Sequence, residues 1–482
     1  MKRTLLSLGV LLFSSCLYAQ QDKTKSIQDF LSGEGNKGYS GTVLVGKKGE
    51  VLFENGIGLA DRESKRKQTA ETVFSIGSIT KQFTAAAIMK LEVQGKLEVN
   101  DVISKYFPGA PADKKNITLH QLLTHTAGFA EVLGDDYDTI DAKAFTDLAM
   151  KSKLVHQPGE AYLYSNVGYS LLGIIVKMVS GKNYEQFIHD ELFVPSGMLH
   201  TGYVIPGFTK EQLAVGYKDG KRWGTAIDHP WKKGGPGWHL RANGGILSTV
   251  GDMYKWYLAL RNNTVLPKAQ TDKMFTQHVA EGPRHLSYYG YGWVVQNNGD
   301  GKLIWHNGGN GVYNAYVGFD LQQDIFIVVS SNSNNTVSDD IAAGLYNIVS
   351  DKAKLKMAPQ EEPEYRSNPV TKSIYEAISK NGAEYFTAHA NEILKQSGFD
   401  FENDMQLLGV GEQLEENKKW DEGIALFKTY TELFPNIVVG WNRLGKCYQQ
   451  KGDIQKAKAC WEKSVSIRPG NNRAAEWLKE LK

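Results

Sequence analysis

Cysteine is scarce in this sequence, with three residues in a chain of 482. Cys16 lies in an apolar leader, which leaves Cys447 and Cys460 near the C-terminus. Two cysteines do not make the disulfide framework that holds small secreted domains together. The sequence does not decide whether they pair, and buried thiols are the default.

The chain also lacks an excess of charge of either sign. Lys and Arg total 55, Asp and Glu total 53, and the formal net charge is +2. This balance excludes the basic field that nucleic-acid binding needs, and it gives no strong acidic or membrane-surface bias. Small molecules or proteins are therefore the expected partners.

Long apolar runs are missing as well. The N-terminus has Lys2 and Arg3 before an apolar core from Leu5 to Phe13, which is shorter than the roughly 20 residues that span a bilayer. The pattern is typical of a secretory signal peptide. Cleavage after Ala19 is preferred, and lipid modification of Cys16 is the alternative. We expect an exported chain, periplasmic or secreted, with no transmembrane span.

What the chain does contain is ample apolar material, with 41% hydrophobic and 11% aromatic residues, enough for a sizeable core. Its central stretch is Phe74 to Gly95, where Ser78 and Lys81 precede residues that are apolar nearly all the way round. Such a helix belongs in a core, and Ser78 should lie in its first turn. Residues three apart share a helix face, so Lys81 is carried towards the Ser78 oxygen in a partly desolvated setting. This is the geometry of an activated nucleophile.

The S-x-x-K spacing alone is weak support, because a second copy occurs at Ser64 and Lys67 in a charged, solvated stretch. A capping Ser followed by a surface Lys is also ordinary chemistry at a helix start. Partners elsewhere in the chain have to decide between the two interpretations.

The strand pattern predicts an α+β fold. The stretch from Tyr39 to Ala60 alternates apolar and polar residues around Lys48 and reads as a β-hairpin. Gly290 to Ser331, with the alternating YGYGWVV, then KLIWHNGGNGVYNAYVGF and then IFIVVSS, reads as adjacent antiparallel strands. The hairpin can complete their sheet, with helices beside and across it. Gly308 and Gly309 inside a strand indicate a close backbone approach or a β-bulge.

Two further helices are expected. A short amphipathic one in Ile117–Phe129 carries His120 and His125, which we interpret as packing and capping residues, since no suitably spaced partner supports a metal site. A second apolar helix follows Tyr164 and Asn166, the one Tyr-x-Asn in the chain.

A Gly-rich loop carries Trp231 and Trp238, which either line a cleft or pack beneath the surface. The sequence assigns them no role.

Three motifs line up in chain order: Ser78-x-x-Lys81, Tyr164-x-Asn166 and His306-Asn307-Gly308-Gly309. With LLTHTAG, PGEAYLYSNVGYSLLG, PSGM and ANGGILST, they make the chain from about Gly38 to Asn334 resemble the Tyr-x-Asn branch of the serine β-lactamase and DD-peptidase family. That branch includes class C β-lactamases, secreted DD-peptidases, esterases and D-aminopeptidases. The resemblance implies a β-lactamase/transpeptidase-like fold and acyl transfer without a metal or organic cofactor.

The resemblance also implies roles for the first two motifs. Ser78 attacks a carbonyl, while Tyr164 and Lys81 share its proton. A phenol ionises near pH 10, so a neighbouring ammonium must stabilise the phenolate for it to act as a base at neutral pH. Tyr164 then returns the proton to the leaving group. Asn166 holds Lys81 and the substrate amide.

The third motif would complete the substrate site. The resemblance implies an oxyanion hole from the N–H groups of Ser78 and Gly309, beside Gly308. His306 stands where class C enzymes usually carry Lys, which puts dedicated β-lactamase activity in doubt but leaves acyl transfer intact. It is expected to donate to a substrate carboxylate or to Tyr164. Because imidazole titrates near pH 6.5, an anchored carboxylate should bind more weakly as pH rises.

The C-terminal part has a different pattern. Beyond a Pro-rich and acidic linker, residues match at an offset of 34, the tetratricopeptide period. The matching pairs are Leu407/Trp441, Gly411/Gly445, Leu414/Tyr448, Gly423/Ala457, Phe427/Trp461 and Pro435/Pro469. Thr371–Lys395 should pack as a degenerate first unit or cap. The repeats either bind a partner or only dimerise or brace the chain.

The sequence therefore predicts a signal peptide (1–19), a β-lactamase-related serine hydrolase domain (20–353), a linker (354–370) and a helical repeat domain (371–482). The expected activity is hydrolysis, through an acyl-enzyme, of a small ester, amide or D-amino-acid peptide. The alternative is a non-hydrolytic sensor or scaffold that binds penicillin or a cell-wall fragment and acts through its repeats.

Overall fold

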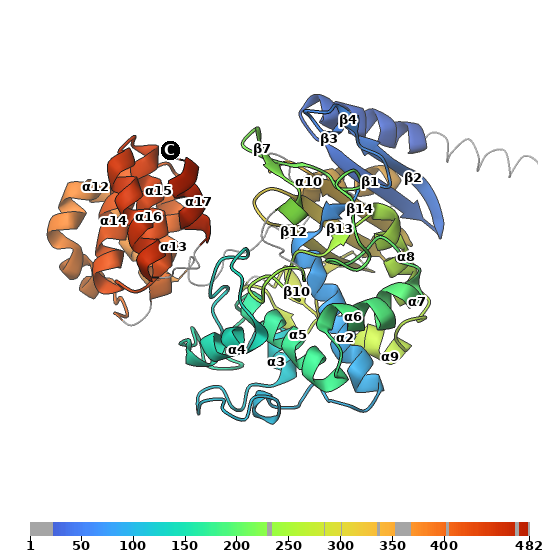
Figure 1. Ribbon diagram of the computed structural model, residues 1–482, viewed down its shortest axis with the longest axis horizontal. Coiled ribbons are helices and arrows are strands. Elements are labelled where there is room, and N and C mark those ends of the chain that lie inside the picture. Colours follow the sequence, from blue (N-terminus) through green and yellow to red (C-terminus); the bar gives the residue numbers. More distant parts are fainter. Residues whose placement is uncertain are drawn as a thin grey trace, which may run out of the picture.

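The chain forms two separate hydrophobic cores. The computed structural model describes residues 23–228, 234–283, 285–299, 301–334, 338–351, 368–401, 404–467 and 472–480. The larger core runs from Ile27 to Val349, and a second runs from Ile374 to Ala474. The first surrounds an antiparallel sheet with flanking helices and the second is all helical, which confirms the expected α+β fold followed by helical repeats (Figure 1).

An eight-stranded antiparallel sheet is the scaffold of the first core. In spatial order its strands are β2 (Glu50–Ile57), β1 (Gly41–Lys47), β14 (Ile325–Ser331), β13 (Asn314–Asp320), β12 (Gly301–Gly309), β11 (Val294–Asn298), β10 (Ser287–Tyr289) and β9 (Val279–Ala280). The predicted hairpin is confirmed as β1 and β2, joined at Lys48 and Gly49, which both have positive φ. β1 pairs with β14, so the hairpin completes the sheet.

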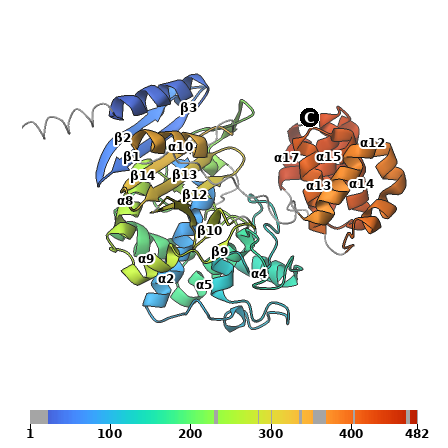
Figure 2. The same cartoon turned by 180° about the vertical axis from the view of Figure 1, so that it is seen from behind.

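Helices cover both faces of the sheet, which is why β1 and β14 are buried along their whole length. α10 (Ser338–Val349) packs on β13 and β14, and in Figure 2 it lies in front of the strands. α8 (Val250–Arg261) packs on β1 and β14 through Tyr254 and Tyr257, whose rings contact Phe326.

The remaining helices of this part gather beside the sheet (Figure 1). They include α2 (Lys81–Val93), α3 (Leu119–Leu123), α4 (Ala142–Lys151), α5 (Asn166–Ser180), α6 (Tyr184–Ile188) and α9 (Lys268–Met274). α2 contacts α5 and is buried on nearly every side, as its uniformly apolar sequence predicts. The starts of α2 and α5 are the two helix ends that carry the predicted motifs.

Two local expectations need adjustment. Ser78 lies in a short 3-10 helix, η1 (Gly77–Thr80), that leads directly into α2, and not in the first turn of α2 itself. The alternating YGYGWVV stretch is not one strand, because Gly292 has a φ of +75° and the chain turns between β10 and β11. The Gly290 N–H donates to Trp293 O across that turn.

Among the described residues, the second core is built from six helices, each of which contacts the next along the chain. They are α12 (Pro369–Gln396), α13 (Asp404–Glu416), α14 (Trp420–Leu433), α15 (Val438–Gln450), α16 (Ile454–Ile467) and α17 (Asn472–Glu480). α12 also packs on α14, and it is kinked at Gly382. A Cβ on Gly411 would overlap the Phe427 ring, and one on Gly445 would overlap Trp461. These two contacts are related by the predicted offset of 34 residues.

Several predictions fall outside the described residues. They are the signal peptide with Cys16, the loop residue Trp231, and most of the linker. Within the part of the chain that is described, no helix is both long enough and apolar enough to cross a membrane. Cys447 and Cys460 are free and buried.

Candidate active site

Ser78 lies where the backbone makes a forced turn. The strand β5 (Phe74–Ser75) pairs with β8 (Leu247–Ser248), and Gly77 then adopts a φ of +52°. A Cβ at Gly77 would also lie 2.5 Å from Gly309 N. Both the positive φ and this lack of space therefore require glycine at this position. The turn holds the half-buried Ser78 at the start of the buried helix α2.

Lys81 is fully buried and its amine has three oxygen neighbours. Its Nζ lies 3.0 Å from Ser78 Oγ, 2.7 Å from Asn166 Oδ1 and 2.8 Å from the Asn243 carbonyl oxygen. The two Asn oxygens are pure acceptors. A neutral amine therefore gives its two hydrogens to them and turns its lone pair to the Ser78 hydroxyl.

The charge state of Lys81 suits that arrangement. Burial lowers the pKa of Lys81 to about 7, while the carboxylates of Glu131 and Asp136 act in the opposite direction. A substantial fraction of the amine is thus unprotonated at neutral pH, which is what a general base requires.

Tyr164 lies beside both Lys81 and Ser78. Lys81 Nζ is 4.6 Å from the centroid of the Tyr164 ring. Burial raises the pKa of the Tyr164 phenol, and a hydrogen bond with the Ser78 side chain opposes that rise only in part. The phenol is therefore neutral at physiological pH, which differs from the expected phenolate.

Asn166 and Asn243 fix the amine from two directions. Asn166 is the first residue of α5, whose N-cap Ser165 accepts a hydrogen bond from the Gly168 N–H. The Asn243 side chain donates to Ser170 Oγ on the same helix, at 2.8 Å. Asn243 belongs to the ANGGILST motif, and nothing in the sequence alone indicates its role.

His306 differs most from its predicted behaviour. It is 2% exposed, and its Nδ1 lies 2.6 Å from the carbonyl oxygen of Asn307, to which it must donate. Its Nε2 then accepts from the hydroxyl of Tyr289, 2.9 Å away. Burial lowers the pKa of His306 to about 3, with a further contribution from Lys81. The imidazole is neutral with both nitrogens occupied, so the expected partial charge near neutrality is wrong.

The predicted close approach at the third motif is confirmed for Gly308. A Cβ there would overlap the Ile76 carbonyl oxygen and lie 2.8 Å from Ser78 N. At Gly309 the nearest atom would be 3.5 Å away, which is ordinary contact. β11 pairs with β12 only as far as Trp305, so beyond that point the edge of β12 faces η1 and the serine.

The two histidines of the LLTHTAG region have protein partners. His120 Nδ1 lies 2.7 Å from the Tyr291 hydroxyl. His125 Nδ1 accepts from the Ser165 N–H at 3.0 Å, and its ring lies 4.4 Å from that of Tyr164. His125 thus braces the segment that carries Tyr164, in line with the packing interpretation.

Three carboxylates act on Lys81 and Tyr164. Glu131 and Asp136 raise the pKa of Lys81, and Glu131 and Glu281 raise that of Tyr164. The Glu131 backbone also joins this region, because its carbonyl accepts from the N–H that opens α5. None of the three acidic residues was singled out from the sequence, since they belong to loops without a recognisable motif.

This fold is that of penicillin-binding proteins and β-lactamases. The solved octameric penicillin-binding protein homologue from Pyrococcus abyssi superposes with a TM-score of 0.60 at 28% identity, covering 72% of this chain and 81% of that one. A model of the Beta-lactamase family matches residues 28–349, and the chain belongs to that family. A Tetratricopeptide repeat model matches residues 438–471.

Two curated relatives agree with this assignment. Penicillin-binding protein 4* of Bacillus subtilis is 27% identical over 326 residues, covering 60% of this chain and 67% of that protein. Protein flp of Staphylococcus aureus (strain MW2) is 28% identical over 329 residues, covering 65% and 64%. The chain thus spans about two thirds of the length of these relatives.

Proposed function

We propose that this protein is an exported serine hydrolase that forms an acyl-enzyme on Ser78. The observation that carries the proposal is the set of three oxygens around Lys81 Nζ, two of which can only accept hydrogen bonds. With those two occupied, the third position is left for removing the proton from the serine.

In the proposed reaction, Ser78 Oγ bonds to the substrate carbonyl carbon as its proton passes to Lys81. The electron pair of the carbonyl bond moves to oxygen, which the N–H groups of Ser78 and Gly309 stabilise. The bond to the leaving group then breaks. The leaving group takes a proton from the Tyr164 hydroxyl, and the proton held by Lys81 restores the phenol. A water molecule then attacks the carbonyl carbon of the acyl-enzyme in the same way. The bond to Ser78 Oγ breaks, Ser78 regains its proton and the carboxylic acid is released.

The charges around the site favour a particular substrate class. A neutral His306 with both nitrogens engaged offers no cation to a substrate carboxylate. The carboxylates of Glu131, Asp136 and Glu281 instead favour a substrate that carries an ammonium group. We therefore favour amides or esters of amino acids with a free α-amine, including D-amino acids, over carboxylate-terminated peptides and β-lactams.

Labelling with a fluorophosphonate and a fluorescent penicillin, together with turnover of a p-nitrophenyl ester, tests the nucleophile. The chain provides its own control, because Ser64 with Lys67 repeats the S-x-x-K spacing. Ser78→Ala should abolish labelling and turnover, whereas Ser64→Ala should leave both unchanged. Equal labelling of wild type and Ser78→Ala would refute the assignment. Stoichiometric binding without turnover would instead favour the sensor or scaffold.

Substrate class is tested with D-phenylalanine p-nitroanilide and its N-acetyl derivative, which lacks the ammonium group. The wild type should prefer the free amine, and Glu131→Gln should reduce that preference roughly twofold to fivefold. Glu98→Gln, at an exposed carboxylate after α2, is the control. Hydrolysis with no preference for the amine would reject the substrate class while leaving the nucleophile assignment intact.

A further inference from the structure

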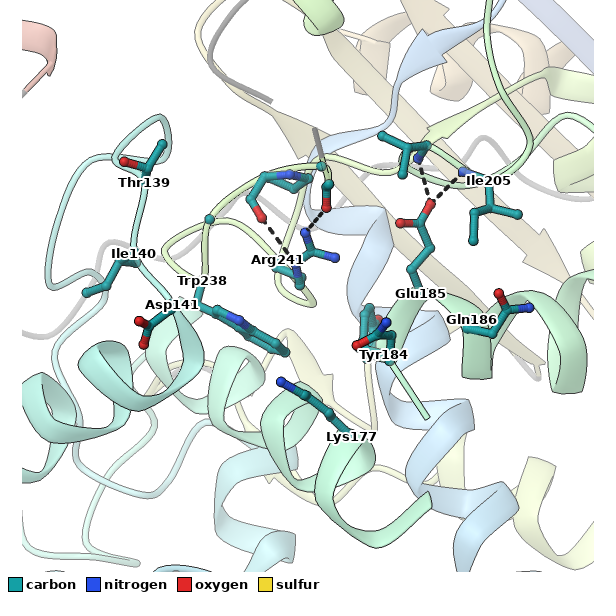
Figure 3. A pocket seen from close by; sticks show the side chains of 16 residues that line it. Thr139, Ile140, Asp141, Lys177, Tyr184, Glu185, Gln186, Ile205, Trp238 and Arg241 are labelled. Carbon is teal, nitrogen blue, oxygen red and sulfur yellow. Dashed lines mark hydrogen bonds between the residues drawn. The ribbon is translucent and has the colours of Figure 1, made fainter. Parts of the chain in front are cut away.

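A cavity lies behind the segment that carries Asn243. Its volume is about 650 Å³, and it opens between α5, α6 and the Gly-rich turn at residues 234–237 (Figure 3). Its walls include Ile140, Lys177, Tyr184, Glu185, Trp238 and Arg241. That volume is in the range of small-molecule sites. Lys177 follows Asn166 by eleven residues along α5, about 16 Å, so the cavity is distinct from the Ser78 site.

One wall of the cavity is formed by two aromatic side chains. Trp238 is 8% exposed, and its ring packs against α5 at Gly173, where a Cβ would lie 3.2 Å from the indole. The Tyr184 ring meets Trp238 edge to face, with centroids 6.4 Å apart. Most of the Trp238 ring is covered by its protein neighbours, so the cavity meets only an exposed edge of it.

The carboxylates at the cavity already have hydrogen-bond donors. Glu185 Oε1 accepts from three consecutive backbone N–H groups, those of Tyr203, Val204 and Ile205, at 2.9, 2.6 and 2.8 Å. Asp141 caps α4 by accepting from the Ala144 N–H at 2.8 Å. These bonds stabilise both negative charges without a cation.

The two cations at the cavity have no carboxylate partner among the described residues. Arg241 Nε donates to Pro236 O at 3.1 Å and Nη2 donates to Gly234 O, so its partners are neutral carbonyls. The guanidinium carbon lies 5.7 Å from the Trp238 ring centroid, beside the aromatic wall. Across the described part of the chain, neither Arg241 nor Lys177 forms an ion pair with a carboxylate. Figure 3 shows Lys177 extending along the Trp238 side of the cavity.

We propose that this cavity is a second ligand site, for a small carboxylate that carries an apolar or aromatic group. The carboxylate pairs with the Arg241 guanidinium, assisted by Lys177, and the apolar group contacts Ile140 and the exposed edge of Trp238. Charge-assisted hydrogen bonds of this kind are the strong ones, and Arg suits a carboxylate best.

The site is connected to the reaction centre through one short segment. Ser170 Oγ donates to Arg241 O at 3.1 Å and accepts from the Asn243 side chain, whose backbone carbonyl in turn holds Lys81. A ligand that binds Arg241 therefore contacts the segment 241–243, which also positions the Lys81 amine through the Asn243 carbonyl.

Isothermal titration calorimetry with N-acetyl-phenylalanine on the full chain tests the proposal. We expect saturable binding, and clearly weaker binding of the neutral N-acetyl-phenylalanine amide. Arg241→Gln should weaken binding of the acid roughly tenfold to a hundredfold, since it removes a charge-assisted bond. Lys177→Glu should weaken it about twofold to fivefold, as for an exposed charge. Lys151→Glu, an exposed lysine at the end of α4, is the matched control and should bind as the wild type does.

Arg241 also holds the turn at residues 234–236, so thermal unfolding of Arg241→Gln must first show a folded protein. If that variant does not fold, Lys177→Glu decides the question, because its side chain is exposed and makes no bond that the fold needs. The proposal is overturned by an absence of saturable binding, by equal affinity for acid and amide, or by an unchanged affinity in the deciding variant.

Discussion

Lys81 Nζ lies 2.7 Å from Asn166 Oδ1. This contact takes one hydrogen of the neutral amine, which helps to turn the lone pair of the amine towards the Ser78 hydroxyl. Because burial lowers the pKa of Lys81 to about 7, kcat/KM should rise with pH through about 7 and level off above it. The unprotonated amine is the active form, so the activity is lost as pH falls.

Asn166→Asp tests this directly, because it places a carboxylate beside the amine. An opposite charge at that distance should raise the pKa of Lys81 by roughly 1–3 units. The rise of kcat/KM should move to higher pH by that amount, with a loss at pH 7 of about fivefold for a shift of one unit and several hundredfold for a shift of three. A profile with an unmoved midpoint would show that Lys81 is not the group that titrates.

His306 should not titrate in the neutral range. Burial holds its pKa at about 3, and Nδ1 and Nε2 are both engaged by Asn307 and Tyr289. The ratio of kcat/KM for paired substrates with and without a carboxylate should therefore contain no His306 step between about pH 5.5 and 8.5. Imidazole NMR signals of selectively labelled protein, assigned with His306→Gln, report the same group independently. A His306 signal that titrates near pH 6.5 would contradict the buried neutral state.

Gly308→Ala and Gly309→Ala form a matched pair. The first adds a methyl group that overlaps Ile76 O and crowds Ser78 N, whereas the second meets nothing closer than 3.5 Å. Gly308→Ala should reduce stability by roughly 1–3 kcal/mol and acylation about a hundredfold or more, since the serine N–H must move. Gly309→Ala should stay close to wild type. Thermal unfolding and acylation rates distinguish them, and equal effects would show that space at Gly308 is not the constraint.

Deleting residues 360–482 should leave a folded, active enzyme. The core from Ile27 to Val349 and the core from Ile374 to Ala474 have no residue in common, and the three motifs all lie in the first. Circular dichroism and ester turnover of the truncated chain test this. An insoluble or inactive product would mean that the helical part completes the first core or covers the catalytic cleft.

Local pattern was enough to predict the hairpin, the antiparallel strands and the pairing of Ser78 with Lys81. Each follows from a period of two or of three to four residues. The close approach at Gly308 was also readable, because a glycine inside a strand needs a reason. The 34-residue offset likewise matched real contacts, since Gly411 and Gly445 each accommodate an aromatic ring from the following helix.

The rest depended on residues far apart in the chain. Asn243 is 162 residues from Lys81, and no local pattern marks its carbonyl as an acceptor. The neutral state of His306 follows from burial and from Tyr289 on another strand, so the residue type alone suggested the wrong charge. The break between β10 and β11 was hidden because the alternation of residues continues through Gly292.

The two free thiols can report how often the helical repeat part of the chain opens. Cys447 on α15 and Cys460 on α16 are both buried, and burial raises their pKa values to about 12 and about 11. Folded thiols of this kind react very slowly with alkylating reagents, because the thiolate is the reactive form. The rate at which they are alkylated therefore measures how often the helical repeats open. Ester turnover in the same sample monitors the part of the chain that contains Ser78.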